Sequence, residues 1–514
     1  MMKRAAAMLL PLFSLRSDND LGRGEIRQLC PFAQWMLQTG HRVLQFLPLT
    51  ESAAGENSPY SALSIFSIDP LYISVGELAG VPGGDLQRAR EQVGGRRSIP
   101  RAELRALKFS LLAAAFMHFR DHGGAGERAG FAQFAAENQH WLPDYALFRA
   151  IKDRLQWADW KQWPAEVRDR HHDTMASARH QLAEPVAMYS YWQYLARRQW
   201  AQTRAELAGL GVSLIGDLAF LPACDSSDVW ANQHLFMLDR LVGAPPDAFS
   251  AKGQRWGLPM PNWPRMRDDG LRWWRERARH GAQLFDALRI DHVVGFYRTY
   301  SFDDDPDAAG AFYPLAEDAQ REQGEAFFTM LKQEVGDDTL IGEDLGTVPP
   351  WVRVSLSALG VMGLKVLRWE KVDWRTPRER FIAPAQYAER SVAVTGTHDT
   401  ETLAQWWREL PPVERTQLAK ALNFPKALNL DASRLDMYLL DAILEPLYAA
   451  PSRIVSAPIQ DLFGWEDRIN LPGSIDEDNW TYRLPQTIEQ LSADHAICQR
   501  AAKLQVMAQR TGRF

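Results

Sequence analysis

The sequence has little cysteine, and its few cysteines are widely spaced. Cys30, Cys224 and Cys498 are the only three among 514 residues, and they form neither a CxxC pair nor the spacing of a metal site. A disulfide framework and a structural zinc site are therefore excluded as organising features of the fold. Inert thiols in a reducing compartment are expected instead, which favours a cytoplasmic protein.

Long hydrophobic runs are also missing. No apolar segment approaches the roughly 20 residues needed to cross a bilayer, so no membrane association is expected. Residues 1–14 begin with basic and continue with apolar residues, which imitates a signal peptide. No small-x-small cleavage site follows them, so we interpret 8–14 as a first buried strand.

The chain lacks an excess of positive charge. The 58 Lys and Arg against 64 Asp and Glu give a net charge of −6, without a dense basic patch. This balance argues against a nucleic-acid partner. No nucleotide-binding loop, serine nucleophile elbow or zinc-type histidine pair is found either.

Tryptophan, by contrast, is abundant. The 19 tryptophans are roughly two to three times the number expected from ordinary globular composition. An indole offers a flat apolar face and one N–H donor, which suits the face of a pyranose ring. Most of these side chains are nevertheless expected in the core or at interfaces.

Eight strand-like runs recur along the chain, and most of them are separated by helical segments. They lie at 8–14, 42–49, 212–220, 287–296, 339–346, 363–369, 391–399 and 453–461. Parallel strands joined by helical crossovers predict an α/β fold, a (β/α)8 TIM barrel with helical and loop insertions. We expect 1–514 to form a single catalytic barrel.

Three stretches interrupt the barrel pattern. Residues 72–207 are mainly helical and predict an inserted subdomain. Residues 221–270 are irregular and rich in proline, which predicts an inserted loop subdomain over the active site. Residues 411–448 predict a helical insertion. Within the second stretch, the loop 245–249 with Trp256 and Trp263 is a candidate for shielding the site, with a rigid structural loop as the equal alternative.

Four carboxylates stand at the ends of predicted strands: Asp217, Asp291, Glu343 and Asp399. The C-terminal ends of barrel strands share one mouth, where active sites are built. Like charges raise one another's pKa, so four converging carboxylates indicate a function rather than chance. Binding of a hard cation and cleavage of a glycosidic bond by paired carboxyls both suit such a cluster.

The positive neighbours of these carboxylates favour glycosidic chemistry. Arg289 lies two residues before Asp291 and therefore points to the same face of a strand. His398 is adjacent to Asp399. These side chains supply the positive charge or hydrogen-bond donors that a metal would otherwise provide. No metal and no cofactor is therefore predicted, although a structural ion pair at a strand end remains the simpler explanation for Arg289 alone.

Several motifs resemble one enzyme family nearly from end to end. They are Ser58-Pro59-Tyr60, Gly216-Asp217, Asp225-Ser226-Ser227-Asp228-Val229-Trp230, Gly253-Gln254-Arg255-Trp256-Gly257, Arg289-Ile290-Asp291-His292, Gly342-Glu343-Asp344, Thr395-Gly396-Thr397-His398-Asp399 and Gln460-Asp461-Leu462. In this order and on these strands, they resemble glycoside hydrolase family 77, the 4-alpha-glucanotransferases of the amylomaltase type, which are related to the α-amylases.

The resemblance implies roles for three carboxylates. Asp291 matches the catalytic nucleophile, Glu343 the general acid/base, and Asp399 a third carboxylate that binds sugar hydroxyls and favours ring distortion. A nucleophile must be anionic, which Arg289 would ensure by a charge-assisted contact. Glu343 must hold a proton near neutral pH, so its pKa must be raised by burial and by Asp291.

The resemblance also implies a set of substrate-binding residues, which are Tyr60, Asp217, Trp256, Arg289 and His398. Tyr60 would stack on the sugar ring at the cleaved position, and His398 would hydrogen-bond to that sugar. The predicted function is retaining transfer of α-1,4-glucan segments between malto-oligosaccharides or starch-like chains, through a covalent glycosyl–Asp291 intermediate. The alternatives are an α-1,4-glucan hydrolase on the same scaffold and a catalytically reduced glucan-binding protein.

Overall fold

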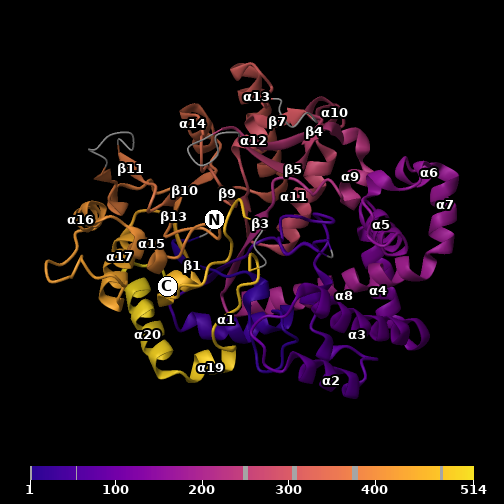
Figure 1. Ribbon diagram of the computed structural model, residues 1–514, viewed down its shortest axis with the longest axis horizontal. Helices are drawn as coiled ribbons and strands as arrows, with labels where there is room; N and C mark the ends of the chain where they lie inside the picture. Colours follow the sequence, from indigo (N-terminus) through magenta and orange to yellow (C-terminus); the bar gives the residue numbers. More distant parts are fainter. Residues whose placement is uncertain (1–2, 54, 247–252, 304–308, 373–379, 475–477) are drawn as a thin grey trace.

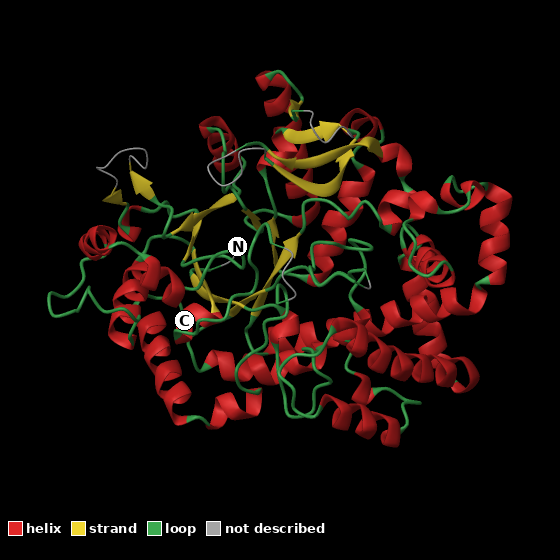
Figure 2. Ribbon diagram, viewed as in Figure 1, coloured by secondary structure: helices red, strands yellow, loops and turns green. Residues whose placement is uncertain are grey.

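The computed structural model describes residues 3–53, 55–246, 253–303, 309–372, 380–474 and 478–514. Eight parallel strands form a closed barrel in the order β1-β14-β13-β10-β9-β6-β3-β2, seen as a ring in Figure 2. Their bounds are β1 Ala5–Leu9, β2 Val43–Gln45, β3 Ser213–Leu218, β6 Ala287–Ile290, β9 Leu340–Gly342, β10 Met362–Val366, β13 Ser391–Val394 and β14 Ile454–Pro458. The predicted barrel and all eight of its predicted strands are confirmed.

The barrel interior is filled by small and branched side chains from every strand. Alternate residues supply this cluster, which includes Ala5, Ala7, Val43, Ile215, Ala287, Ile341, Met362, Leu364, Val366, Val392, Val394 and Ile454. Side chains of a strand alternate between its two faces, so every second residue points inward. The barrel is thus a packed core, and its chemistry is restricted to the strand ends.

The first strand begins earlier than predicted. β1 covers Ala5–Leu9, and a 3-10 turn at Leu12–Ser14 takes up the end of the predicted strand 8–14. Pro11 lies between them and has no N–H with which to continue a ladder. The three alanines at the start of β1 are weak strand formers by composition, and all three are buried.

The segment 72–207 is helical, as its sequence indicates. Its helices are α2 Gly83–Val93, α3 Arg101–His122, α4 Ala125–Glu137, α5 Leu142–Arg154, α6 Ala165–Arg168, α7 His172–Gln181 and α8 Ala183–Gly209. They lie to one side of the barrel, on the right and below it in Figure 1. The long α8 leads directly into β3 and packs against both α5 and α1.

The segment expected as an irregular loop at 221–270 instead contains regular structure. β4 Phe236–Ala244 and β5 Gln254–Pro261 pair with β7 Thr299–Asp303 and β8 Ala311–Tyr313 in an antiparallel sheet of order β5-β4-β7-β8. The β4–β5 register shifts twice, and β5 contains prolines that only an edge strand tolerates. Because of these two features, hydrophobic residues do not alternate regularly along β4 and β5, so the sequence pattern does not indicate strands there.

The remaining helices surround the barrel and follow its strands. They are α1 Leu29–Leu37, α9 Ser227–Ala231, α10 Trp263–Asp268, α11 Arg272–Leu284, α12 Val294–Tyr297, α13 Glu317–Val335, α14 Pro350–Ala358, α15 Leu403–Glu409, α16 Pro412–Ala421, α17 Met437–Ala449, α18 Ile459–Phe463, α19 Ile488–Ala493 and α20 His495–Arg510. Two short strands, β11 Lys371–Val372 and β12 Arg380–Phe381, pair in an antiparallel manner. Within the described ranges, no helix has the length and apolar character needed to cross a membrane.

Candidate active site

The end of β6 carries a buried arginine that contacts two carboxylates at the barrel mouth. Arg289 is buried, and its Nη1 lies 2.6 Å from Oδ2 of Asp217 and 3.1 Å from Oδ1 of Asp291. Asp217 belongs to β3, whose register places it directly beside Arg289. The predicted contact between Arg289 and Asp291 is present, but Asp217 shares it at a shorter distance. One guanidinium therefore serves two carboxylates.

Asp291 is further fixed by the backbone around it. Its own N–H donates to the carbonyl of Leu218, and its Oδ2 accepts a 3.3 Å hydrogen bond from the N–H of Phe220. Both partners belong to the end of β3 and the segment that follows it. Its side chain is 23% exposed, so one side of the carboxylate faces the mouth while the other is held.

Glu343 follows β9 and lies against the residue after Asp291. The backbone N–H of His292 donates a 2.7 Å hydrogen bond to Oε2 of Glu343. Burial, together with the negative charge of Asp291 and more weakly that of Asp399, raises the pKa of Glu343 to about 8, against the opposing effect of Arg289. The carboxyl is therefore protonated at neutral pH, as required of a general acid.

Asp399 has the opposite electrostatic character. Burial alone would raise its pKa, but the charge and hydrogen bond of His398 and the amide of Asn470 lower it to about 2. His398 Nε2 lies 3.2 Å from Oδ2, and Nδ2 of Asn470 donates to Oδ1 at 2.6 Å. The mouth therefore holds a protonated Glu343 and an ionised Asp399, two carboxyls with separated roles.

An aromatic stack forms one wall of the site. The Tyr60 ring stacks on His398 at 5.3 Å between centroids, and Trp480 lies 5.6 Å from Tyr60 and 5.7 Å from His398. The Tyr60 hydroxyl donates a 2.6 Å hydrogen bond to Oδ2 of Asp217. Tyr60 is thereby connected, through Asp217, to the same cluster as Arg289.

Two residues of this site escaped the sequence analysis. Asn470 and Trp480 both lie in the long segment after α18, which has no strand pattern and no recognisable motif of its own. Arg468 strengthens the connection, because its Nη2 donates a 2.9 Å hydrogen bond to the carbonyl of Asp399. Only the folded chain brings this segment to the end of β13.

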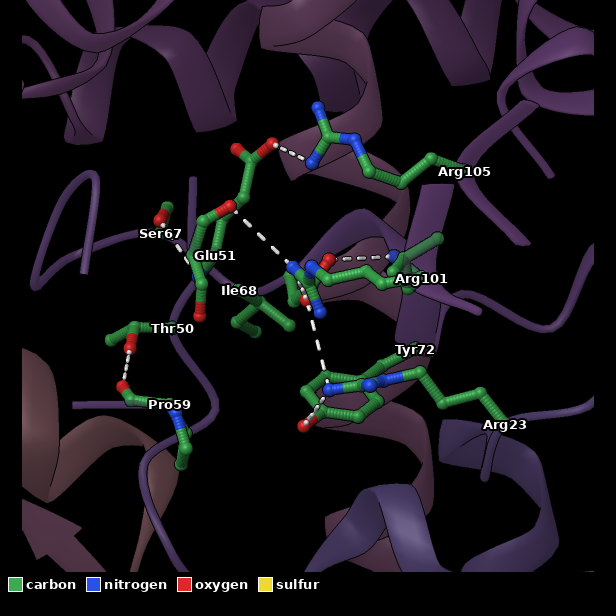
Figure 3. A network of polar contacts seen from close by, with 12 residues as sticks. Arg23, Thr50, Glu51, Pro59, Ser67, Ile68, Tyr72, Arg101 and Arg105 are labelled. Carbon is green, nitrogen blue, oxygen red and sulfur yellow. Dashed lines mark hydrogen bonds and ion pairs between the residues drawn. The ribbon is translucent and has the colours of Figure 1, made fainter. Parts of the chain in front are cut away.

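A buried polar network contacts the loop that carries Tyr60 (Figure 3). Hydrogen bonds of 2.7 Å from Thr50 Oγ1 to the Pro59 carbonyl and from Ser52 Oγ to the Ser58 carbonyl close the loop. The intervening Glu51 is fully buried. The loop is therefore a constrained turn, which fixes where the Tyr60 ring can lie.

Helices α3 and α5 supply the cations of this network. Arg149 Nε lies 3.1 Å from Oε1 of Glu51, and Arg105 Nη1 lies 3.6 Å from it. Tyr145 donates a hydrogen bond to Oε2 of the same carboxylate. Nearby, Arg101 pairs with Asp69 at 2.7 Å. The helical segment is thus connected to the catalytic mouth through the Tyr60 loop.

A cavity of about 200 Å³ opens beside Glu343, between the barrel mouth and the antiparallel sheet. Trp256 lines it and contacts His292 edge-on at 4.7 Å. Trp263 does not reach it: that side chain is 1% exposed and donates from Nε1 to Thr299 Oγ1 within the core. The shielding role expected for Trp263 is therefore wrong. Residues 247–249 of the expected shielding loop lie outside the described residues.

The arrangement suits acid–base and nucleophilic chemistry on a sugar. It combines a protonated carboxyl, three other carboxylates, an arginine shared between two of them, and aromatic faces of the kind that pack on pyranose rings. Among the described residues, no group of three or more His, Cys, Asp or Glu side chains could hold a metal ion.

Comparison with known proteins decides the family. The family model described as 4-alpha-glucanotransferase matches residues 10–488, nearly the whole chain. The protein belongs to glycoside hydrolase family 77. A 4-alpha-glucanotransferase of Chlamydia muridarum is 32% identical over 96% of this chain and 94% of its own length. The 4-alpha-glucanotransferase of Thermus thermophilus is 31% identical over 99% of both chains.

Solved structures agree with this family-77 assignment. The amylomaltase of Streptococcus agalactiae in complex with acarbose superposes with a TM-score of 0.87 at 26% identity, covering 99% of this chain and 100% of that one. The amylomaltase of Corynebacterium glutamicum shares the fold, with a TM-score of 0.80 at 22% identity over 98% of this chain and 75% of that one. The predicted family, fold and enzyme class are confirmed.

Proposed function

We propose that this family-77 enzyme is a retaining 4-alpha-glucanotransferase in which Asp291 is the nucleophile and Glu343 the general acid/base. The observation that carries the proposal is the placement of two carboxyl groups with different surroundings at one mouth. Glu343 holds a proton at neutral pH, while Asp291 contacts the buried guanidinium of Arg289 at 3.1 Å. A proton donor and a nucleophile are therefore available in the same state of the enzyme.

The reaction has two steps. In the first, Asp291 attacks the anomeric carbon while Glu343 gives its proton to the glycosidic oxygen, so the reducing-end fragment leaves with a free 4-hydroxyl. In the second, Glu343, now a carboxylate, takes the proton from the 4-hydroxyl of an acceptor, whose oxygen displaces Asp291. Two inversions at one carbon retain the α configuration, and Glu343 recovers its proton.

The other residues bind and orient the donor sugar. Asp399, held ionised by His398 and Asn470, accepts hydrogen bonds from ring hydroxyls and favours a distorted ring. Asp217 and Tyr60, joined by their 2.6 Å hydrogen bond, position the same sugar, and Arg289 holds Asp291. Trp256 faces the cavity on the side of Glu343, where it packs against the sugar beyond the cleaved bond.

The proposed substrates are malto-oligosaccharides or other α-1,4-glucans. The structure of the amylomaltase from Streptococcus agalactiae was obtained with acarbose bound, and that protein covers the full length of this one. A cytoplasmic location is also proposed, since the three cysteines are all unpaired. We propose a single catalytic barrel over 1–514 with insertions at 72–207, 221–270 and 411–448.

Incubation of the protein with maltotriose alone tests the proposal. A transferase gives glucose together with a ladder of longer malto-oligosaccharides, which chromatography or mass spectrometry resolves. Shortened products alone would establish the hydrolase alternative. Binding of maltotriose without any change in chain length would establish a catalytically reduced glucan-binding protein.

A further inference from the structure

The cavity beside Glu343 has a composition that points to a sugar ligand. Its walls include the aromatic side chains of Trp256, Tyr300 and Phe312. Tyr300 and Phe312 meet edge-on at 4.9 Å, on the neighbouring strands β7 and β8. Aromatic surface with a few polar groups is the usual lining of a carbohydrate site.

One arginine of this cavity forms no close ion pair with the residues that the structure describes, and the carboxylate of Glu317 acts on it only from a distance. Arg298 comes directly after α12, and its guanidinium lies over Phe312, with Cζ 4.1 Å from the ring centroid. Its Nη2 donates a long 3.3 Å hydrogen bond to the Thr347 carbonyl. Its Nε is buried and finds no hydrogen-bond partner, and within the described ranges Arg298 forms no ion pair.

The absence of a close ion pair among the described residues distinguishes Arg298 from Arg240 of the same sheet. On β4, Arg240 lies 3.0 Å from the carboxylate of Asp303 and also hydrogen-bonds to Ser301. A buried donor without a partner is unfavourable unless a ligand supplies an acceptor. A guanidinium held over an aromatic ring, with a buried N–H unused, is prearranged to receive oxygen acceptors from a ligand.

The position of the cavity decides which sugar would occupy it. Glu343 lines the cavity, and its carboxyl must meet both the departing glycosidic oxygen and the incoming 4-hydroxyl. Asp399 and Tyr60 do not line this cavity and are assigned to the donor sugar. A sugar in the cavity is therefore on the acceptor side of the cleaved bond.

We infer that Arg298 is a specificity-determining residue of the acceptor site, where its guanidinium donates hydrogen bonds to hydroxyl oxygens of a neutral glucose unit packed against Phe312 and Trp256. This inference rests on the proposed transferase function and deepens it. Arg298 takes no part in bond breaking. It determines how well an acceptor sugar competes with water for the glycosyl–enzyme intermediate.

The test uses a donor whose leaving group does not enter the cavity. With α-maltotriosyl fluoride as donor and glucose or maltose as acceptor, fluoride release in the absence of acceptor reports the donor side alone. Arg298→Ala should leave the first-turnover release of fluoride unchanged within about twofold. The KM for the acceptor should rise by roughly 10- to 100-fold, the usual effect of losing hydrogen bonds to a charged group, and hydrolysis should increase at the expense of transfer.

Two further variants make the result specific. Arg298→Lys keeps the charge but not the planar donors, so it should recover only part of the acceptor affinity. Arg240→Ala, which removes an arginine of the same sheet outside the cavity, should leave the KM for the acceptor unchanged. Circular dichroism and thermal unfolding confirm that all three variants are folded.

Each of the other possible results would contradict one part of the proposal. Transfer by the wild type with an unchanged KM for the acceptor in Arg298→Ala would refute the role of Arg298. Equal losses in fluoride release and in transfer would assign Arg298 to the donor side or to structure. A glucose phosphate that replaces glucose as the better acceptor, only when Arg298 is present, would show that the cavity selects an anion. Absence of transfer by the wild type would refute the proposed function itself.

Discussion

The backbone N–H of His292 donates a 2.7 Å hydrogen bond to Oε2 of Glu343. His292, which follows the proposed nucleophile Asp291, therefore fixes the position of the proposed acid Glu343. The two strands that carry them are hydrogen-bonded neighbours, with Ile290 beside Gly342 in the register of β6 and β9. The relative position of the two catalytic carboxyls is thus set by main-chain pairing, which tolerates side-chain substitution elsewhere.

Asp291→Asn should abolish glucan transfer, with a loss in kcat of at least about 10³-fold, because an amide cannot form the covalent intermediate. Binding of maltotriose should persist and can be followed by calorimetry. Asp268→Asn, at an exposed position of α10, serves as the matched control and should keep full activity. A variant at residue 291 that turned over at the parent rate would assign the nucleophile elsewhere.

Glu343→Gln should separate protonation from nucleophilic attack. With malto-oligosaccharides we expect kcat to fall by roughly 10²- to 10⁴-fold, the usual contribution of a general acid. With α-maltotriosyl fluoride, whose leaving group needs little protonation, formation of the glycosyl–enzyme should be much less affected. Similar losses with both donors would contradict a role as proton donor.

The raised pKa of Glu343 predicts the alkaline limb of the wild-type pH profile. The first step requires the protonated form, which predominates below the pKa of about 8. The value of kcat/KM should therefore be maintained near neutrality and should fall as the pH rises through 8. A fall that begins near pH 5, close to the ordinary range of a glutamic acid, would show that burial does not have this effect in the free enzyme.

Asn470→Ala should impair catalysis through Asp399. The lost 2.6 Å hydrogen bond helps to keep the pKa of Asp399 at about 2, so its removal should raise that pKa and move the acid limb of kcat/KM to higher pH. We expect kcat/KM to fall by about tenfold, since a hydrogen bond to a charged group contributes on the order of 1.5 kcal/mol. A merely structural role would lower activity without moving the acid limb.

Two further variants control this result. Asn470→Asp should be worse than alanine, because it places a second carboxylate against Asp399. Asn429→Ala, at an exposed position between α16 and α17, should change neither the rate nor the pH profile.

Glu51→Gln tests the network behind the Tyr60 loop. The fully buried carboxylate faces Arg149 and Arg105, so neutralising it leaves buried cations without their partner. The free energy of unfolding should fall by about 3 kcal/mol. Urea unfolding measures this loss, and the KM for maltotriose should rise because Tyr60 is less well held.

Glu184→Gln provides the comparison for Glu51. Its ion pair with Arg120 is exposed, and such pairs contribute only about 0–1 kcal/mol. Equal effects of the two substitutions would mean that burial of the Glu51 network adds nothing to stability.

The barrel was predictable because its strands are buried on both faces and end in charged motifs. Runs such as 391–399 combine three apolar residues with His398 and Asp399, so strand and site are visible together. β4 and β5 were missed because the shifts in their register and the prolines of β5 remove the two-residue alternation. Local patterns detect a strand only where its pairing is regular.

Only part of the site was predictable from the sequence, as was true of the fold. Asp291, Glu343 and Asp399 stand at strand ends within recognisable motifs. Asn470, Trp480 and Arg298 stand in no motif and acquire their significance from neighbours distant in the chain. A hydrogen bond between residues 399 and 470 depends on the path of an irregular segment, which composition and periodicity do not encode.

The pairing of β1 with β14 also determines when the enzyme can become active. Ala5 pairs with Ile454, and Leu9 with Pro458. The barrel strand β1 therefore lacks this partner until β14 has been synthesised. Contacts so distant in sequence form slowly, and a chain that leaves the ribosome from its N-terminus cannot close the ring before residue 458 has emerged. A nascent chain released earlier would hold Asp291, Glu343 and Asp399 on an open sheet. Catalysis is therefore coupled to the synthesis of the last barrel strand by the geometry of the barrel itself.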